Sequence, residues 1–177
     1  DLPPAGQDAR LDAVVGWLST PTRAASASTW THIASASEDA SFRRYFRVTD
    51  HNGKTAIVMD APPPKEDVRP FVSVGRLLAS GGIHVPQILA EDAERGFLLL
   101  DDLGRTTYLA ALADCTAERR DAMFVDAITT LVALQQINPG LASLPVPAYD
   151  PALLRRELDL FPDWYLDRHT RTELTSD

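Results

Sequence analysis

The stretch of sequence that decides the fold runs from Ser41 to Val48 and reads Ser-Phe-Arg-Arg-Tyr-Phe-Arg-Val. Its alternation predicts a β-strand with the even-numbered residues on one face and the odd-numbered residues on the other. Three of the eight residues are arginines, in a chain whose formal net charge is −8. Because guanidinium groups match phosphate oxygens, the strand indicates a nearby anion. The alternative is an edge strand with a solvated basic face.

We assign this strand to Phe42 to Thr49. Further strands are predicted before and after it. Trp30 to Ala36 precedes it, and Thr55 to Asp60 follows after an Asn-Gly pair that is typical of a tight hairpin. Val85 to Ala90 and Gly96 to Leu100 flank a short charged turn and complete the set. The sequence thus predicts an antiparallel sheet of five strands.

Two helices accompany the predicted sheet. Apolar residues at helical spacing mark a first helix from about Gln7 to Ser19, ended by Pro21. A second runs from about Glu66 to Ser80, between the third and fourth strands, and stops at a Gly-Gly pair.

Beyond Leu103 only helices are predicted. Thr106 to Ala113 forms a short one, and Thr116 caps a long one that ends near Ile137. A last helix begins at Asp150-Pro151 and should kink at Pro162. The long helix carries an apolar stripe that we expect to be buried, made of Phe124, Ala127, Ile128, Leu131 and Leu134.

Strands followed by helices indicate an α+β protein with two lobes. We predict an N-terminal helix and connector (residues 1–28), a sheet lobe (29–102), and a hinge with the first helices of a second, incomplete lobe (103–177).

The composition excludes several classes of function. A net charge of −8 disfavours nucleic acid and anionic membranes as partners. Cys115 is the only cysteine and the four histidines are scattered, so the sequence predicts neither a disulfide nor a metal cluster. The amino-terminal residues do not resemble a signal peptide, and together with the single cysteine this favours the cytoplasm.

The segment Leu98 to Gly104, Leu-Leu-Leu-Asp-Asp-Leu-Gly, lies at the predicted lobe boundary. It would serve as a hinge whose backbone groups meet an adenine, or simply as a buried strand followed by an ordinary turn. Asp101 and Asp102 raise the question of paired carboxylates for acid–base chemistry. We prefer a hinge turn.

The ordered set of segments resembles the aminoglycoside phosphotransferase family. The likeness rests on residues 39–47, on the strand and turn 56–63, on residues 99–104, and on matches between 149 and 166 that include Trp164-Tyr165. It covers nearly the whole chain from about Leu11. It is greatest to bacterial kinases that phosphorylate the anomeric hydroxyl of N-acetylmuramate and N-acetylglucosamine during cell-wall recycling.

The resemblance implies a protein-kinase-like fold, with a nucleotide-binding N-lobe and an α-helical C-lobe, and ATP with Mg²⁺ as cofactors. Residues 39–43 would form the turn over the phosphates, with Ser41 offering its hydroxyl and backbone N–H. Ala56 would line the adenine pocket, and the backbone of Leu100 to Leu103 would bond the base. The implied cofactor-binding residues are Ser41, Phe42, Arg43, Arg44, Ala56, Leu100, Asp101, Asp102 and Leu103.

Two departures from the kinase pattern stand out. Kinases carry a lysine on the third strand that pairs with a glutamate of the next helix. Here the only lysines are Lys54, in the hairpin, and Lys65, after a proline run, and Glu66 stands only at the start of the helix. Arg43 or Arg44 would supply the missing charge, or ATP would be held largely through magnesium. A catalytic His-x-Asp loop is also absent from the 177 residues.

We therefore expect a truncated small-molecule kinase that is inactive alone, binds a sugar when intact, and takes its metal ligands from a further segment. The alternatives are a kinase of the same fold for an aminoglycoside, choline or homoserine, and a non-catalytic nucleotide-binding or interaction module. Apolar surface left uncovered around Phe124 and Phe161 should favour self-association. Trp164 and Tyr165 would either line a sugar site or pack in a core.

Overall fold

The computed structural model describes residues 4, 6–20, 30–38 and 41–171. The chain divides into two compact units, Asp1–Leu144 and Pro145–Asp177. The first unit contains these elements in order: α1 (Ala9–Leu18), β1 (Trp30–Glu38), β2 (Arg44–Asp50), β3 (Thr55–Asp60), α2 (Arg69–Ser80), β4 (Ile88–Asp92), β5 (Phe97–Asp101), α3 (Tyr108–Ala113), α4 (Ala117–Gln135) and the 3₁₀ turn η1 (Pro139–Leu141). The second contains α5 (Pro151–Leu160) and the π-helix η2 (Phe161–His169).

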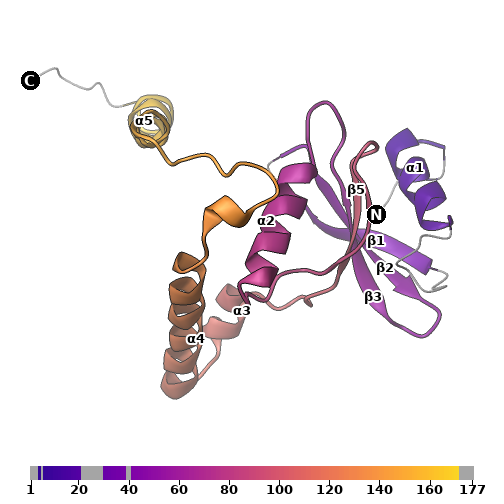
Figure 1. Ribbon diagram of the computed structural model, residues 1–177, viewed down its shortest axis with the longest axis horizontal. Coiled ribbons are helices and arrows are strands. Elements are labelled where there is room, and N and C mark those ends of the chain that lie inside the picture. Colours follow the sequence, from indigo (N-terminus) through magenta and orange to yellow (C-terminus); the bar gives the residue numbers. More distant parts are fainter. Residues whose placement is uncertain (1–3, 5, 21–29, 39–40, 172–177) are drawn as a thin grey trace, which may run out of the picture. The chain divides into compact units, whose positions relative to one another are not determined.

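The sheet has five antiparallel strands in the order β1-β2-β3-β5-β4 (Figure 1). The predicted α+β class and the number of strands are confirmed. The β2–β3 hairpin turns through Gly53 at φ +79°, a conformation that glycine adopts without strain. The Asp50 carboxylate stabilises this turn by accepting the backbone N–H groups of Asn52 (2.8 Å) and Lys54 (2.9 Å).

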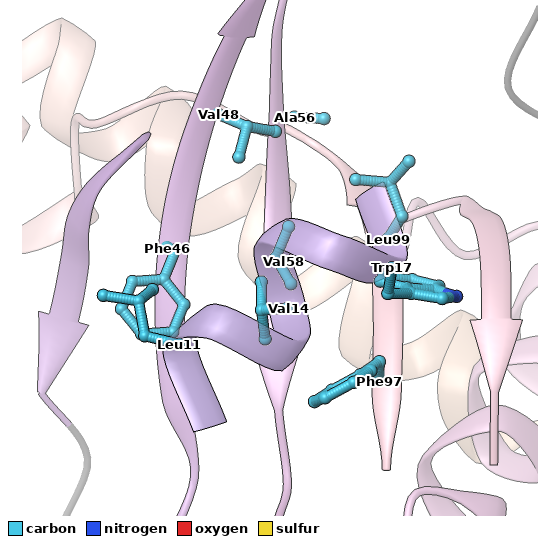
Figure 2. Close-up of a cluster of buried hydrophobic side chains, with 9 residues drawn as sticks. All are labelled: Leu11, Val14, Trp17, Phe46, Val48, Ala56, Val58, Phe97 and Leu99. Atoms are coloured by element: carbon cyan, nitrogen blue, oxygen red, sulfur yellow. The ribbon is translucent and has the colours of Figure 1, made fainter. Parts of the chain in front are cut away.

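The sheet buries side chains on both faces. Alternate residues of β2, β3 and β5 pack with Leu11, Val14 and Trp17 of α1 (Figure 2). The intervening residues of β3 and β5 pack with α2 and the residue before it, in a cluster of Met59, Ala61, Val68, Val72, Leu98 and Leu100. Figure 1 shows α1 and α2 on opposite sides of the sheet. We call these sides the α1 face and the α2 face.

A glycine is required just before the start of β5, beside the end of β3. Gly96 has φ +75°, and a Cβ at this position would overlap the carbonyl oxygen of Ala61. The Ala61 N–H donates to the Gly96 carbonyl at 2.9 Å, so the two backbones are in direct contact. This contact fixes the course of the chain as it leaves β3 for the loop before α2.

Several predicted boundaries shift. β1 extends to Glu38, and β2 begins at Arg44 because Phe42 and Arg43 belong to the turn before it. α2 begins at Arg69 rather than Glu66, since residues 62–66 form a turn around the Pro62 carbonyl. β4 lies at Ile88–Asp92 instead of residues 85–90. The edge-strand alternative for β2 is wrong, because β2 lies between β1 and β3.

The expectation of a buried stripe on α4 is also wrong for the described chain. Thr116 does cap the helix, accepting the N–H of Arg119 at 3.3 Å. Phe124 is nevertheless 51% exposed, Ala127, Ile128, Leu131 and Leu134 are exposed as well, and Met123 is the buried residue of α4. Apolar surface is thus open around Phe124, and in the second unit around Phe161, while self-association stays a prediction.

In the second unit, Asp150 caps α5 by accepting the N–H of Leu153 at 2.8 Å, and Pro151 occupies the first turn, as predicted. At Phe161 the helix changes from α to π, in the segment that contains Pro162. The rings of Phe161, Tyr165 and His169 follow one another along the π-helix, with centroids 5.3 and 5.5 Å apart. Trp164 and Tyr165 are both exposed.

The packing of α1 on the sheet yields a first prediction. Trp17 is 4% exposed and its ring lies 5.5 Å from that of Phe97. Replacing Trp17 with Ala should lower the free energy of unfolding by about 3–5 kcal/mol in a denaturant titration, because it leaves a cavity. The matched control is Val15→Ala, an exposed residue of the same helix, expected within about 0.5 kcal/mol of the wild type. Equal effects of the two variants would mean that α1 does not pack on the sheet.

Candidate functional site

The turn before β2 lies at the end of the sheet where β3 stops, since Arg44 pairs with Asp60 across the strands. We call Ser41–Arg43 the phosphate turn, after the role that the resemblance implies; Asp39 and Ala40, which the resemblance also assigns to it, lie outside the described residues. The Ser41 hydroxyl accepts the N–H of Arg43 at 3.2 Å. This bond holds the turn in a compact form.

A carboxylate fills the mouth of this turn. Glu66 accepts the backbone N–H of Phe42 at 3.3 Å and the Nε–H of Arg43 at 3.0 Å. One backbone donor and one guanidinium converging on oxygen atoms form the kind of donor set that binds a phosphate. The residues present therefore fit the phosphate end of a nucleotide.

The loop after β3 lies against the phosphate turn. The Pro62 carbonyl accepts the N–H groups of Lys65 and Glu66, each at 3.1 Å. The Lys65 ammonium lies 4.3 Å from the centre of the Phe42 ring. Both contacts of the loop, through Glu66 and through Lys65, place its charges beside the same turn.

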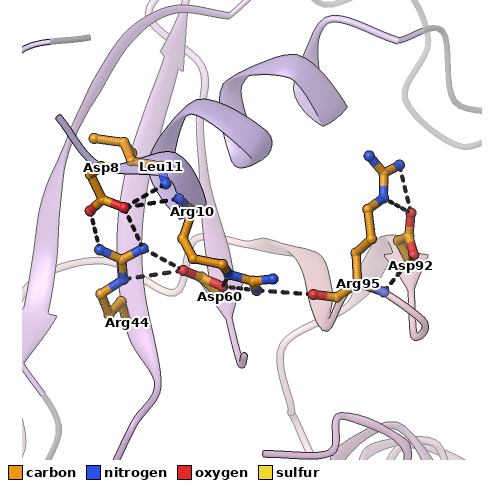
Figure 3. A network of polar contacts seen from close by, with 7 residues as sticks. All are labelled: Asp8, Arg10, Leu11, Arg44, Asp60, Asp92 and Arg95. Atoms are coloured by element: carbon orange, nitrogen blue, oxygen red, sulfur yellow. Dashed lines mark hydrogen bonds and ion pairs between the residues drawn. The ribbon is translucent and has the colours of Figure 1, made fainter. Parts of the chain in front are cut away.

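Arg44 has a different position from the one expected. Its side chain lies on the α1 face, where it donates to Asp60 Oδ2 from Nη2 (2.7 Å) and Nε (3.1 Å) and forms an ion pair with Asp8, the N-cap of α1 (Figure 3). Arg10 of α1 also pairs with Asp60 and donates to the Arg95 carbonyl at 2.9 Å. The Asp60 side chain has no exposed surface. Arg44 is therefore bonded to two carboxylates on the face opposite Tyr45 and Arg47.

Arg47, the second arginine of β2, reaches the other end of the sheet. Arg47 forms a two-point ion pair with Asp102, from Nε to Oδ2 at 2.6 Å and from Nη2 to Oδ1 at 2.9 Å. It also donates to the Gly104 carbonyl at 3.1 Å. These contacts fix the residues that follow β5; we call residues 100–104 the hinge segment, after the role expected from the sequence.

Neither acid of the hinge segment is arranged for proton transfer. The Arg47 guanidinium, with help from the N–H of Gly104 and from Thr55, holds the pKa of Asp102 well below its usual range despite burial. Asp101 accepts the backbone N–H of Gln87 at 2.6 Å and so ties the hinge to the chain before β4. Both carboxylates are therefore engaged in holding the backbone around the end of β5.

The remaining predicted site residues divide between surface and core. Leu103 is 53% exposed, and in the part of the chain that the structure describes its backbone N–H donates to no other group. This N–H fits the edge of an adenine ring. Leu100 is buried among the α2-face residues. Ala56 is completely buried beneath α1, so its side chain offers no surface to a nucleotide, and Ile57 faces the α2 side instead.

The phosphate turn and the hinge segment lie at opposite ends of the sheet. Asp101 pairs with Ala56 and Arg44 with Asp60, so the two ends are four residues apart along β3. At 3.3 Å per residue this separation is about 13 Å. An extended nucleoside triphosphate can bridge it with its base at the hinge and its phosphates at the turn.

Sequence reasoning missed several residues of this arrangement. Asp8, Arg10 and Asp60 were not assigned a role, although alternation places Arg44 beside buried Phe46 and Val48 and a half-buried arginine needs a carboxylate. Lys65 was set aside because it follows the proline run, and Glu66 because it stands only at the start of the predicted helix. No pattern in the sequence predicts that the loop after β3 lies beside the phosphate turn.

Over residues 4, 6–20, 30–38 and 41–171, no three His, Cys, Asp or Glu side chains gather as they would around a metal ion. No helix in the same ranges has the length and apolar character needed to cross a membrane.

The low pKa of Asp102 gives a pH prediction. Its folded-state pKa is depressed, so the ion pair with Arg47 adds stability above the unfolded-state pKa of about 4, and this stability is lost as the pH falls below that value. The free energy of unfolding of wild type should exceed that of Asp102→Asn most at pH 6, and the difference should narrow between about pH 4 and pH 2. A difference that stays constant with pH would refute the pairing, and Asp114→Asn, an exposed acid, serves as the control.

Comparison with known proteins identifies the family. A model of the phosphotransferase enzyme family matches residues 32–176. The N-acetylmuramate/N-acetylglucosamine kinase of Pseudomonas aeruginosa is 57% identical over 139 residues, which are 78% of this chain and 39% of that protein. The kinase of the same name from Pseudomonas putida is 52% identical over 136 residues, 77% of this chain and 38% of the relative.

A third kinase of this name, from Neisseria meningitidis serogroup B, is 40% identical over 142 residues, 79% of this chain and 41% of the relative. The chain spans about two fifths of the length of these relatives. The family match covers the whole sheet from His32 onward and all helices after it. The chain belongs to the phosphotransferase enzyme family.

Proposed function

We propose that this chain forms the nucleotide-binding lobe, hinge and first C-lobe helices of an ATP-dependent kinase that phosphorylates a hydroxyl of N-acetylmuramate or N-acetylglucosamine. The observation that carries the proposal is the pair of donor sets at the two ends of one sheet. The phosphate turn offers Arg43 and the N–H of Phe42, and the hinge segment offers the N–H of Leu103 from the opposite end of β3.

The proposal gives each end of the sheet one task. The hinge segment binds the base through its backbone, and the Arg47–Asp102 pair keeps that backbone in place. The phosphate turn binds the phosphates, with Ser41 and Arg43 as donors. Positioning and charge neutralisation are the main requirements of phosphoryl transfer. Magnesium, when bound, neutralises further phosphate charge.

The choice of substrate rests on the relatives. Three relatives, 40–57% identical to this chain, bear the name N-acetylmuramate/N-acetylglucosamine kinase. We assign the same amino sugars to this protein, and place the reaction in the cytoplasm, where ATP is supplied, and in cell-wall recycling. The base and the metal ligands belong, in this proposal, to the three fifths of the relatives' length that the chain does not span, so the chain alone is inactive.

Nucleotide binding by the 177-residue chain tests the lobe assignment. Titration calorimetry should give saturable binding of MgATP. Arg43→Gln should weaken it about tenfold, as expected for loss of a charged hydrogen bond. The control is Arg76→Gln, an exposed arginine of α2 that pairs with Glu91 and should leave binding unchanged. If wild type, Arg43→Gln and Arg76→Gln bind MgATP with equal affinity, Arg43 does not contact the nucleotide.

Phosphoryl transfer requires a separate test on the product of the complete reading frame that encodes this chain. With MgATP and either amino sugar, ³¹P NMR should show a new phosphate ester at the anomeric position. Products from aminoglycosides, choline or homoserine alone would replace the sugar assignment with one of those substrates. Nucleotide binding without any product would indicate the non-catalytic module.

A further inference from the structure

We propose that Lys65, in the loop after β3, supplies the ammonium group that meets the nucleotide phosphates, in place of a lysine within β3. This inference rests on the proposed function and names a further binding residue of that site. The interior of β3 offers no cation, since Ile57, Val58 and Met59 are apolar and at least half-buried. A cation that meets the phosphates, as a lysine does in kinases, would therefore have to come from a neighbouring segment.

Three of the surrounding cations are paired with carboxylates away from the phosphate turn. Arg10 and Arg44 bind Asp60 on the α1 face, and Arg47 binds Asp102 at the hinge. Arg43 is at the phosphate turn but is paired with Glu66, whose side chain is only 13% exposed. Lys65 is exposed, and within the described ranges no carboxylate forms an ion pair with it.

The loop is built so that Lys65 lies beside the phosphate turn. The two N–H groups donated to the Pro62 carbonyl close the loop, and the next residue, Glu66, is tied to Phe42 and Arg43. These bonds carry the Lys65 ammonium onto the Phe42 ring at 4.3 Å. Glu66 therefore fixes the loop to the phosphate turn through hydrogen bonds, whereas Lys65 makes only a cation–π contact with Phe42.

The strengths of these contacts decide which cation moves to a phosphate. An exposed cation–π contact is worth about 0.5–1 kcal/mol, less than a hydrogen bond between charged groups at about 1.5–3 kcal/mol. Lys65 thus leaves its partner at small cost, whereas Arg43 is held by the carboxylate that braces the turn. Glu66 keeps Arg43 in place at the turn through its Nε, and Lys65 adds a second, movable cation for the phosphates.

Lys54 is a matched control for Lys65. These are the only two lysines of the chain. Both are exposed, but Lys54 lies in the β2–β3 hairpin, at the opposite end of β3 from the phosphate turn. A probe that reports on lysines beside bound phosphates should therefore separate them cleanly.

The first experiment uses an acyl-phosphate derivative of ATP, whose acyl group passes to a nearby lysine amine while the nucleotide phosphate leaves. Peptide mass spectrometry of the 177-residue chain should find the label on Lys65, with little on Lys54, and excess MgATP should suppress it. Equal labelling of both lysines that MgATP does not suppress would overturn the assignment.

The second experiment measures affinity. Lys65→Gln should weaken MgATP binding about tenfold, Lys65→Arg should restore most of it, and Lys54→Gln should have no effect. Adenosine, which has no phosphate, should bind wild type and Lys65→Gln equally, whereas a general distortion of the lobe would weaken both ligands. MgATP binding by wild type that Lys65→Gln leaves unchanged would refute the role of Lys65 and leave the proposed function standing. Absence of any nucleotide binding by wild type would overturn both.

Discussion

The buried carboxylate of Asp60 is the constraint on which the arrangement of the sheet lobe depends. It has no exposed surface and receives guanidinium groups from α1 (Arg10) and from β2 (Arg44) (Figure 3). An unpaired carboxylate in such a position would be strongly unfavourable, so the charge is stable only while both elements remain in place. Asp8 adds a second acid to Arg44 at the start of α1. The helix, the first residue of β2 and the last residue of β3 are thus joined at one point.

The cations of the sheet lobe fall into two groups, one that holds the fold together and one at the phosphate turn. On the α1 face, arginines pair with carboxylates and hold the fold together, whereas Arg43 lies within the phosphate turn and Lys65 lies beside it. Because Arg44 directly follows Arg43, fixing the former on one face sets the starting point and direction of the latter. Arg47 performs the equivalent structural task at the hinge, where it binds Asp102. The proposed nucleotide site therefore depends on ion pairs that do not touch the nucleotide.

Much of this fold could be predicted because its signals are local. Alternation revealed the strands, the Asn-Gly pair revealed the β2–β3 hairpin, and Thr116 and Asp150 were recognised as helix caps. Pairings between distant segments had no such signal: Arg44 finds Asp8 from 36 residues away, and Arg43 finds Glu66 from 23. The apolar stripe on α4 shows that burial, unlike helix formation, could not be predicted from the sequence. Its periodicity predicts a helix correctly, but whether that face is covered depends on what packs against it.

We infer that Arg44 stabilises the sheet lobe through Asp8 and Asp60 and does not bind nucleotide. The most direct test is the free energy of unfolding of Arg44→Met measured with and without saturating MgATP, since a ligand adds stability according to its affinity for the folded state. Without nucleotide, Arg44→Met should lose about 3 kcal/mol because Asp60 is left underpaired. On adding MgATP, its free energy of unfolding should rise by the same increment as that of wild type. If Arg44→Met unfolds with the same free energy as wild type and MgATP adds no stability to it, Arg44 binds the phosphates instead.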